Sequence, residues 1–326
     1  MPHVICLRPI HDDALAKMRA TEGVTVEVLM DLSPDSLAAR LPHADALIVR
    51  TAKIDRPLLA HCTQLKILAR HGVGYDQVDV AALTERGIPL TITPDANAVS
   101  VAEHALMLML ACARKLSGYD GNMHQPKPVW GGQPSLPTFD LAGRTVLVVG
   151  FGRIGTRVAK LCAAFDMKVL VRDPNVAKGT IAGLGFTPVD DAAEAAGQAD
   201  IVTLHVPSNP QTRHMVDAQF LARMKPGAVL VNTARGTVLD QSALEASLRA
   251  GHLSAAGIDV FEEEPVETPL SLLSAPNLVM TPHVAASTAQ GLRRMALDSA
   301  GAVLACFAGT LDPEIVVNAE VLPRRN

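Results

Sequence analysis

A glycine-rich turn between two apolar runs constrains the fold of this chain more than any other feature. The turn GFGRIG contains Gly150, Gly152 and Gly155 and follows the apolar run TVLVV. A helical pattern comes next, and a second apolar run ends at Asp173. Strand, tight turn, helix and strand in this order predict a βαβ unit that binds a dinucleotide. Gly150 would permit the turn, Gly152 would admit a pyrophosphate to the backbone, and Gly155 would let the helix pack closely on the sheet.

The residues around this turn also bear on which dinucleotide binds. The helix that follows offers free N–H groups and a positive dipole end to phosphates. Asp173 stands where a carboxylate can accept hydrogen bonds from ribose hydroxyls and repel a 2′-phosphate, so we expect NAD rather than NADP. NADP stays an alternative cofactor, because Arg172 could stack on adenine, or could tolerate a phosphate if Asp173 turned away. A βαβ unit whose glycines serve packing alone is the competing interpretation.

The bulk composition predicts a two-domain globular protein. The chain has 326 residues, more than a single domain usually holds. Hydrophobic residues make up 48% of it but aromatic residues only 3%, so the core must be aliphatic, as in parallel sheets covered by helices. The net charge is −4 without a basic block, and nothing points to nucleic acid or to an anionic membrane.

The cysteines and the apolar stretches indicate a cytoplasmic protein. The five cysteines are scattered and form no CxxC, which favours reduced thiols over disulfides or a metal site. The N-terminal apolar run is too short for a signal peptide. The longest apolar stretch, residues 105–113, is too short to cross a bilayer and is expected to form a buried helix.

Short apolar runs alternate with helical patterns along the whole chain, which predicts an α/β fold. The expected strands of the first array are residues 4–7, 24–29, 46–49, 66–69 and 90–92. Those of the second array are residues 146–149, 169–171, 201–204, 228–231, 255–258 and 278–280. We therefore expect two doubly wound parallel-sheet domains, a flavodoxin-like substrate domain and a Rossmann NAD domain, with a cleft between them as the default small-molecule site.

The segments between and after the two arrays set the expected domain boundaries. A long helix is predicted over 98–116, with Ser100 and Glu103 as a capping box, and the Gly- and Pro-rich stretch 118–137 reads as a loop. One more helix, residues 287–307, is too little for a domain and is expected to return to the first array. The predicted domains are residues 1–97 with 286–326 and residues 98–285.

Three polar residues follow predicted strands of the second array. They are Arg235 in VNTARG, Glu264 in DVFEEEP and His283 in TPHVAAS. At the carboxyl edge of one sheet, Arg can grip a carboxylate, His can exchange a proton near neutral pH, and a carboxylate can orient the imidazole. This set suits hydride transfer at a 2-keto acid. Taken singly, the three residues could equally form a surface ion pair, a solvated loop and a loop hydrogen bond.

The chain resembles the D-isomer-specific 2-hydroxyacid dehydrogenases over nearly its whole length. The resemblance rests on VLVVGFGRIGTRVA, LHVPSNPQTRHMV, MKPGAVLVNTARGTVLD, AAGIDVFEEEP and LVMTPHVAAST, in the family's order. It implies an NAD(P)-dependent oxidoreductase with Arg235, Glu264 and His283 as the catalytic set. It also implies that Asp259 approaches the nicotinamide amide. The cofactor-binding positions that it implies are Gly150, Gly152, Arg153, Ile154, Gly155, Asp173, His205, Pro207, Thr212, Thr233, Ala234, Asp259, His283 and Ala285.

The resemblance assigns substrate binding largely to the first array. In RHGVGYDQVD the N–H groups around Val73 and Gly74 would hold the substrate carboxylate, beside Arg235, although a plain strand-to-helix turn is the alternative. Arg50 and Arg70 resemble the pattern of D-3-phosphoglycerate dehydrogenases and would favour a second anionic group on the substrate. Either arginine could instead pair with an acid, and hydroxypyruvate or glyoxylate reduction is the alternative activity.

Further expectations follow from the same resemblance. The chain stops at Asn326, so we expect no C-terminal regulatory domain. Family members are usually homodimers with the helix over 98–116 near the interface. Formate dehydrogenases carry Gln where Glu264 stands, which argues against that activity. Some relatives act as co-repressors with the same triad, so an NADH-sensing binding protein is the alternative from another class. A purely structural Rossmann domain would leave the triad without a role.

Overall fold

The computed structural model describes residues 1–131, 137–267 and 270–323. The chain divides into two compact units, Met1–Asn97 with Ser287–Asn326 (unit 1) and Ala98–Ala286 (unit 2). Unit 2 thus ends at Ala286, one residue later than the predicted domain end at residue 285. The roles of the two domains stay a prediction. Within the described residues, no helix combines the length and the hydrophobicity that a membrane crossing requires.

Unit 1 is built on a parallel sheet of five strands in the order β2-β1-β3-β4-β5. This is a doubly wound, flavodoxin-like order. The strands are β1 (His3–Leu7), β2 (Thr25–Leu29), β3 (Ala46–Val49), β4 (Ile67–Arg70) and β5 (Leu90–Thr91). The helices are α1 (Asp12–Arg19), α2 (Pro34–Arg40), α3 (Arg56–His61), α4 (Val80–Glu85) and α12 (Ala289–Phe307), with 3₁₀ turns at Leu41–His43, Pro313–Ile315 and Ala319–Val321.

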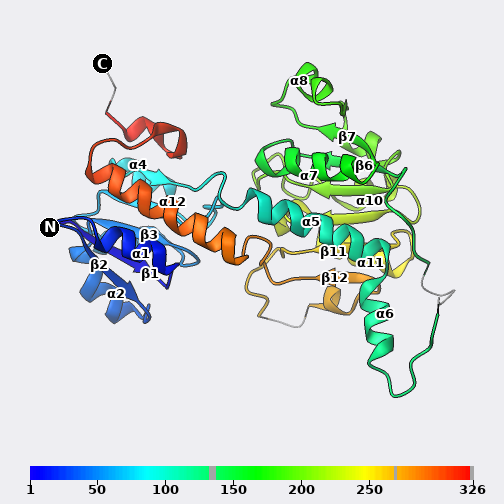
Figure 1. Cartoon of the computed structure of the whole chain (residues 1–326), viewed down its shortest axis with the longest axis horizontal. Coiled ribbons are helices and arrows are strands. Elements are labelled where there is room, and N and C mark those ends of the chain that lie inside the picture. Colours follow the sequence, from blue (N-terminus) through cyan, green and yellow to red (C-terminus); the bar gives the residue numbers. More distant parts are fainter. Residues whose placement is uncertain (132–136, 268–269, 324–326) are drawn as a thin grey trace. The chain divides into compact units, whose positions relative to one another are not determined.

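Helices cover both faces of this sheet. One apolar cluster joins the strands to α1 and α12, which lie along the same face (Figure 1), and a second joins them to residues of α3 and α4. Strand β3 is buried at every position, from Ala46 to Val49. Burial on both faces explains why its sequence is continuously apolar rather than alternating.

Unit 2 is built on a parallel sheet of seven strands in the order β12-β11-β10-β9-β6-β7-β8. The strands are β6 (Thr145–Val149), β7 (Lys168–Arg172), β8 (Thr187–Pro188), β9 (Ile201–Leu204), β10 (Val229–Asn232), β11 (Ala255–Ile258) and β12 (Leu278–Met280). The helices are α5 (Ala98–Ala113), α6 (Leu116–Met123), α7 (Arg153–Ala164), α8 (Lys178–Gly183), α9 (Ala192–Ala196), α10 (Ala218–Arg223) and α11 (Gln241–Arg249), with 3₁₀ turns at Gly236–Val238 and Ser271–Ser274.

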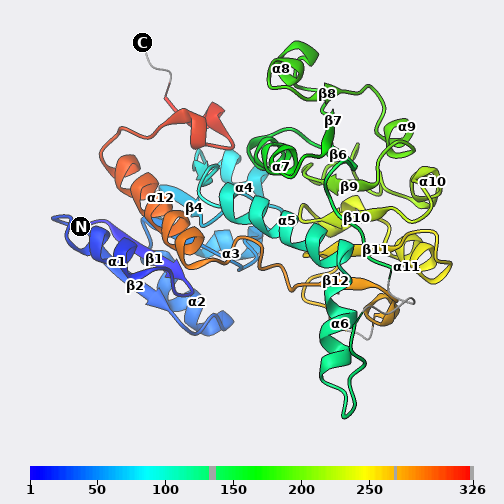
Figure 2. The same ribbon diagram turned by 45° about the vertical axis from the view of Figure 1, so that its right-hand side comes forward.

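The order of these strands reverses between β6 and β9, which is the position where doubly wound sheets bind ligands. Helices α5, α7 and α8 contribute to the apolar cluster on one face, and α9, α10 and α11 to that on the other. Figure 2 shows α5 and α7 side by side on the first face. The expected α/β fold with two parallel-sheet domains is therefore confirmed.

The segment after α5 differs from the expectation. Helix α5 ends at Ala113, and a second helix, α6, occupies Leu116–Met123, part of which was expected to be loop. Lys115 separates the two helices in a left-handed conformation with φ of 51°. The proposed capping box is also wrong, because Ser100 is the third residue of α5 rather than the residue before it. Residues 132–136 of the expected loop lie outside the described residues.

The first and third glycines of the turn after β6 have roles that a larger residue could not fill. Gly150 has φ of +95°, and a Cβ atom there would lie 2.6 Å from the carbonyl oxygen of His205. A Cβ atom on Gly155 would lie 1.9 Å from the carbonyl oxygen of Gly150. The close packing of α7 on the turn therefore depends on Gly155, as the motif predicts.

Replacing Gly155 by alanine is expected to lower the free energy of unfolding by about 2 kcal/mol or more, because the turn and α7 must move apart. Urea denaturation followed by circular dichroism would measure the effect. Gly183→Ala is the matched control, because a Cβ atom at Gly183 meets nothing within 4 Å. Equal stabilities of the two variants would contradict the packing role of Gly155.

Candidate active site

Arg235, Glu264 and His283 all lie in unit 2, on the connections that follow β10, β11 and β12. These strands are parallel neighbours, so the connections leave the sheet at the same edge. Buried Asn232, the last residue of β10, shapes the connection that carries Arg235. Its Nδ2 donates to the carbonyl of Arg235 at 2.9 Å, and its Oδ1 accepts from the amide of Ala234 at 3.0 Å.

Glu264 and His283 form a direct pair. The imidazole Nδ1 of His283 lies 2.5 Å from Oε2 of Glu264, and the other carboxylate oxygen accepts from the amide of Phe261 at 2.8 Å. About half of the His283 side chain, 51%, is exposed, against 33% for Glu264. The pair therefore engages Nδ1 and leaves the side chain of His283 partly exposed.

The surroundings of Glu264 keep its carboxyl group ionised. Burial by itself raises the pKa of Glu264, but the hydrogen bonds from His283 and Phe261 and the charges of His283 and Arg235 oppose it. The net result is a pKa below the ordinary value of 4.5. The charge of Arg235 is the smallest of these contributions.

Gly236 explains how the Arg235 connection reaches the Glu264 connection. A Cβ atom on Gly236 would lie 1.9 Å from the backbone carbon and oxygen of Phe261. Only glycine permits this approach, so the backbones after β10 and β11 are in direct contact. This role of Gly236 is not among the sequence predictions, although a glycine directly after a candidate catalytic arginine is a signal that could indicate it.

His283 has an uncommon backbone conformation, with φ of 53°. A residue other than glycine adopts this region at a cost of about 1 kcal/mol or more, so its surroundings must hold it there. The His283 amide donates to the carbonyl of Asp259 at 2.7 Å and to that of Thr281 at 3.1 Å. The backbone that follows β11 thus fixes the direction in which the imidazole leaves the chain.

The side chain of Asp259 completes this support. It is 1% exposed, and its Oδ1 accepts from the hydroxyl of Thr281 at 2.6 Å and from the amide of Val284 at 2.8 Å. Its Oδ2 accepts from the amide of Ala285 at 2.9 Å. A buried carboxylate without such donors would be costly, so these bonds hold the loop around His283 and satisfy the charge together.

His104 extends the same network from α5. Its Nε2 lies 2.9 Å from the hydroxyl oxygen of Thr281 and 3.7 Å from Oδ1 of Asp259. His104 and Thr281 are not among the residues predicted from the sequence, because His104 lies in a segment that reads only as a buried helix. The role expected for Asp259 at the nicotinamide amide stays a prediction beside its contacts with the loop.

The glycine turn fits a dinucleotide phosphate. Helix α7 starts at Arg153 without a side-chain cap, which leaves first-turn N–H groups for an anion. A Cβ atom at Gly152 would meet nothing within 4 Å, so the backbone there is open to approach. Asp173 accepts from the amides of Phe151 at 2.7 Å and Asn175 at 2.8 Å, and it therefore also ties the turn to the end of β7.

The other expected cofactor residues follow β9, β10 and β12. The described residues offer no hydrogen-bond partner to two buried atoms, Nδ1 of His205 and Oγ1 of Thr233, and such atoms suit a bound polar group. Burial lowers the pKa of His205 to about 3, so its imidazole is neutral. Of the remaining expected positions, Ile154 lies in α7. Pro207 and Thr212 follow β9, and the carbonyl of Pro207 accepts from the hydroxyl of Thr212 at 2.6 Å. Ala234 follows β10, and Ala285 follows β12, where its amide donates to Asp259.

The expected substrate residues outside this set lie in unit 1. Arg50 directly follows β3, and Arg70 is the last residue of β4. Val73 and Gly74 lie in the turn after β4. The Arg70 guanidinium donates to backbone carbonyls within unit 1, including that of Gly74 at 2.6 Å.

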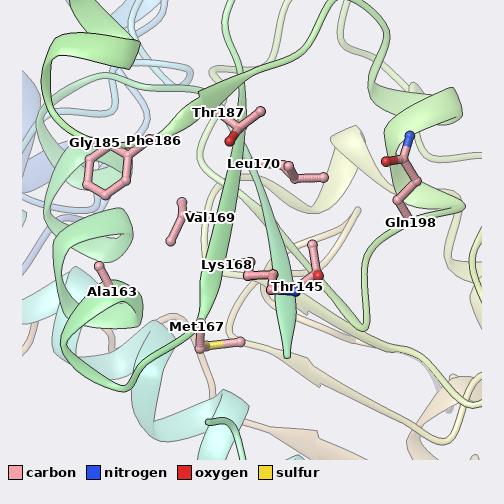
Figure 3. A pocket seen from close by; sticks show the side chains of 10 residues that line it. All are labelled: Thr145, Ala163, Met167, Lys168, Val169, Leu170, Gly185, Phe186, Thr187 and Gln198. Atoms are coloured by element: carbon pink, nitrogen blue, oxygen red, sulfur yellow. The ribbon is translucent and has the colours of Figure 1, made fainter. Parts of the chain in front are cut away.

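A cavity of about 440 Å³ in unit 2 lies away from this chemistry. Its lining includes Thr145, Lys168 and Thr187, which are the first residues of β6, β7 and β8 (Figure 3). These positions mark the amino edge of the sheet, opposite to the edge that carries the polar set. Among residues 1–131, 137–267 and 270–323, no cluster of His, Cys, Asp and Glu could hold a metal ion.

Comparison with known proteins assigns a family to this fold. The model of the D-isomer specific 2-hydroxyacid dehydrogenase NAD binding domain matches residues 106–285. The chain is 41% identical over 314 residues to a D-3-phosphoglycerate dehydrogenase of Mycobacterium leprae, covering 93% of the chain and 58% of that protein. It is 40% identical over 272 residues to a hydroxypyruvate reductase of Thermotoga maritima, covering 82% of the chain and 86% of that protein.

The fold of the whole chain is similar to that of a solved structure. An NADPH-dependent glyoxylate/hydroxypyruvate reductase from Sinorhizobium meliloti, in complex with citrate, superposes with a TM-score of 0.85 at 29% identity and full coverage of both chains. The chain spans 58–61% of the length of the D-3-phosphoglycerate dehydrogenases that it matches.

The Asp259 network makes a testable prediction about stability. In Asp259→Asn an NH₂ group would replace one carboxylate oxygen. It would face either the amide of Ala285 or the two groups that donate to Oδ1, and two donors cannot bond to each other. The free energy of unfolding should therefore fall by about 2 kcal/mol. Chemical denaturation would measure it. Asp217→Asn is the matched control, since Asp217 accepts a single amide at the start of α10 and Asn caps helices equally well. A tolerated Asp259→Asn would refute the supporting role.

Proposed function

Because the chain belongs to the D-isomer-specific 2-hydroxyacid dehydrogenase family, we propose that it interconverts a 2-keto acid and its D-2-hydroxy acid with a nicotinamide cofactor. The observation that carries this proposal is the 2.5 Å pair of His283 and Glu264, with the Arg235 connection in backbone contact with the Glu264 connection at Gly236. An acid–base group and a carboxylate-binding cation on one sheet edge are what reduction of a keto acid requires.

The residues have distinct proposed roles in the reaction. The nicotinamide, when bound, supplies or accepts the hydride at the carbonyl carbon. Nδ1 of His283 is engaged by Glu264, so Nε2 is the nitrogen that faces the substrate oxygen. In reduction, protonated His283 donates its Nε2 proton to that oxygen, and in oxidation the neutral imidazole takes the hydroxyl proton. The ionised Glu264 stabilises the imidazolium and orients the ring.

Arg235 is the proposed anchor for the substrate in unit 2. A guanidinium can bind a carboxylate through two parallel hydrogen bonds and polarise the neighbouring carbonyl. The turn at Val73 and Gly74 is the proposed carboxylate-binding element of unit 1, since consecutive backbone N–H groups can form an anion nest.

NAD is the proposed cofactor. The fit of the glycine turn to a pyrophosphate supports a dinucleotide, and the carboxylate of Asp173 at the end of β7 supports NAD over NADP. NADPH is the cofactor of the Sinorhizobium meliloti relative, so both cofactors belong in the assay.

The proposed physiological substrates are 2-keto acids with a second anionic group. Phosphohydroxypyruvate is an example, because it carries a phosphate as 3-phosphoglycerate does. Arg50 supports this proposal, because this half-buried guanidinium has no hydrogen bond or ion pair to any residue that the structure describes. A second guanidinium, that of Arg70, lies near the same edge of the sheet, at the end of β4. Hydroxypyruvate or glyoxylate is the alternative substrate, as in the Thermotoga maritima relative.

We further propose a cytoplasmic homodimer. Large apolar side chains are exposed on α6 and just after it, with Trp130 81%, Val129 59% and Leu116 57% exposed. Neighbouring exposed apolar residues such as Val129 and Trp130 are typical of protein interfaces. The scattered, free cysteines support a reducing compartment.

The catalytic assignment predicts the phenotype of His283→Ala. Turnover should fall by about 10²–10⁴-fold, the usual contribution of a general acid or base, while NADH binding stays nearly intact. In the wild type, keto-acid reduction consumes one proton and hydroxy-acid oxidation releases one, so a rising pH should shift the reaction toward oxidation. Steady-state kinetics and NADH fluorescence titration measure both. Undiminished turnover in the variant would remove His283 from the mechanism.

A substrate panel tests the function itself. We expect NADH to be consumed faster than NADPH. We also expect phosphohydroxypyruvate or sulfopyruvate to be reduced in preference to hydroxypyruvate, glyoxylate and pyruvate. A preference for substrates with uncharged tails would refute the second-anion proposal and support the reductase alternative. Tight NADH binding without turnover on any keto acid would instead support a sensor of the dinucleotide.

A further inference from the structure

The side chain of Arg70 is directed onto the backbone of its own turn. Its Nε donates to the carbonyl of Gly74 at 2.6 Å. Its Nη1 donates to the carbonyl of His71 at 2.9 Å and to that of Val49 at 3.2 Å. One half-buried guanidinium thus joins the end of β3 to both ends of the turn that follows β4.

These bonds fix the direction of the peptide groups in the turn. In a planar trans peptide the C=O and N–H point in opposite directions, so holding the oxygen also aims the hydrogen. The carbonyl of Gly72 accepts from the amide of Thr93 at 3.0 Å, which aims the N–H of Val73. The N–H of Gly74 lies in the next peptide group, between the one held by Thr93 and the one whose carbonyl, that of Gly74, accepts from Arg70. The Arg70 bond to the carbonyl of His71 holds the peptide group that precedes them.

The amides aimed in this way remain available. Among the residues that the structure describes, the N–H groups of Val73 and Gly74 donate to no acceptor. Gly72 has φ of +136°, a conformation that only glycine adopts readily and that lets consecutive N–H groups converge. The positive guanidinium behind the turn adds to its attraction for an anion.

Arg50 differs from Arg70 in this respect. Its guanidinium makes no hydrogen bond or ion pair within the described residues, whereas that of Arg70 already holds three carbonyls. The sequence pattern treats the two arginines as equivalent ligands of a second anionic group. The structure therefore leaves the guanidinium of Arg50 available to a substrate anion, whereas that of Arg70 is bound to backbone carbonyls.

We propose that Arg70 is a positioning residue that presets the Val73–Gly74 turn for the carboxylate common to all 2-keto acids, which leaves selection of a charged tail to Arg50. This inference rests on the proposed function. It separates two consequences: loss of Arg70 weakens binding of every keto acid alike, and loss of Arg50 weakens binding of those with a second anion.

The kinetic test uses Arg70→Met, Arg70→Lys and Arg50→Ala, assayed with phosphohydroxypyruvate and glyoxylate. Arg70→Met should raise KM for both substrates by roughly tenfold or more with kcat largely kept, because uniform binding is lost. Arg70→Lys should raise it less, since an ammonium can reach only part of the three carbonyls. Arg50→Ala should impair phosphohydroxypyruvate far more than glyoxylate.

The matched control is Arg86→Met. Arg86 also lies in unit 1 and donates to two backbone carbonyls, those of Leu59 and Cys62, but away from the turn. Its loss should leave both KM values close to those of the wild type. A rise in KM in this variant equal to that of Arg70→Met would attribute the effect to general loosening of unit 1 and overturn the proposal.

Hydrogen exchange provides a readout that needs no turnover. In Arg70→Met the amides of His71 and Thr93, which bind the carbonyls of Val49 and Gly72, should exchange faster, whereas Arg86→Met should leave them protected. Unchanged exchange in Arg70→Met would overturn the proposal, as would a KM increase confined to phosphohydroxypyruvate. If the wild type reduces no keto acid, the proposed function fails, and hydrogen exchange still decides whether Arg70 holds the turn.

Discussion

The buried carboxylate of Asp259 is the constraint on which the candidate site depends. It accepts two backbone amides and one hydroxyl from the loop after β12, and its own carbonyl receives the amide of His283. The left-handed backbone of His283 is unfavourable alone, so these bonds must outweigh its cost. The same conformation brings the imidazole to Glu264. The buried carboxylate of Asp259 thus positions the imidazole of His283.

Close backbone approaches complete the arrangement. Gly236 brings the connection of Arg235 against the backbone of Phe261, three residues before Glu264, and Gly155 brings α7 against the turn at Gly150. Each contact excludes a Cβ atom. The parallel sheet supplies the common edge, but these contacts set which backbone segments meet there. The candidate site therefore combines a general property of doubly wound sheets with a few positions at which only glycine fits.

Local patterns in the sequence predict the elements that local physics determines. The apolar runs of the two sheets, the glycine turn and the strand ends that carry Arg235, Glu264 and His283 could all be read in this way. The helix α6 could not, because the Gly and Pro residues around it favour a loop and a left-handed Lys115 separates it from α5. The contacts of Arg70 and His104 could not either, since they join residues whose partners depend on the folded chain.

We propose that Glu264 and His283 act as one unit in proton transfer, and a double-mutant cycle on kcat/KM measures whether they do. Glu264→Gln, His283→Ala and the double variant would be compared with the wild type in keto-acid reduction. If the carboxylate acts through the imidazole, the double variant should be no slower than His283→Ala alone, because interacting residues are not additive. If the losses multiply in the double variant, the two residues act independently, and Glu264 does not act through His283.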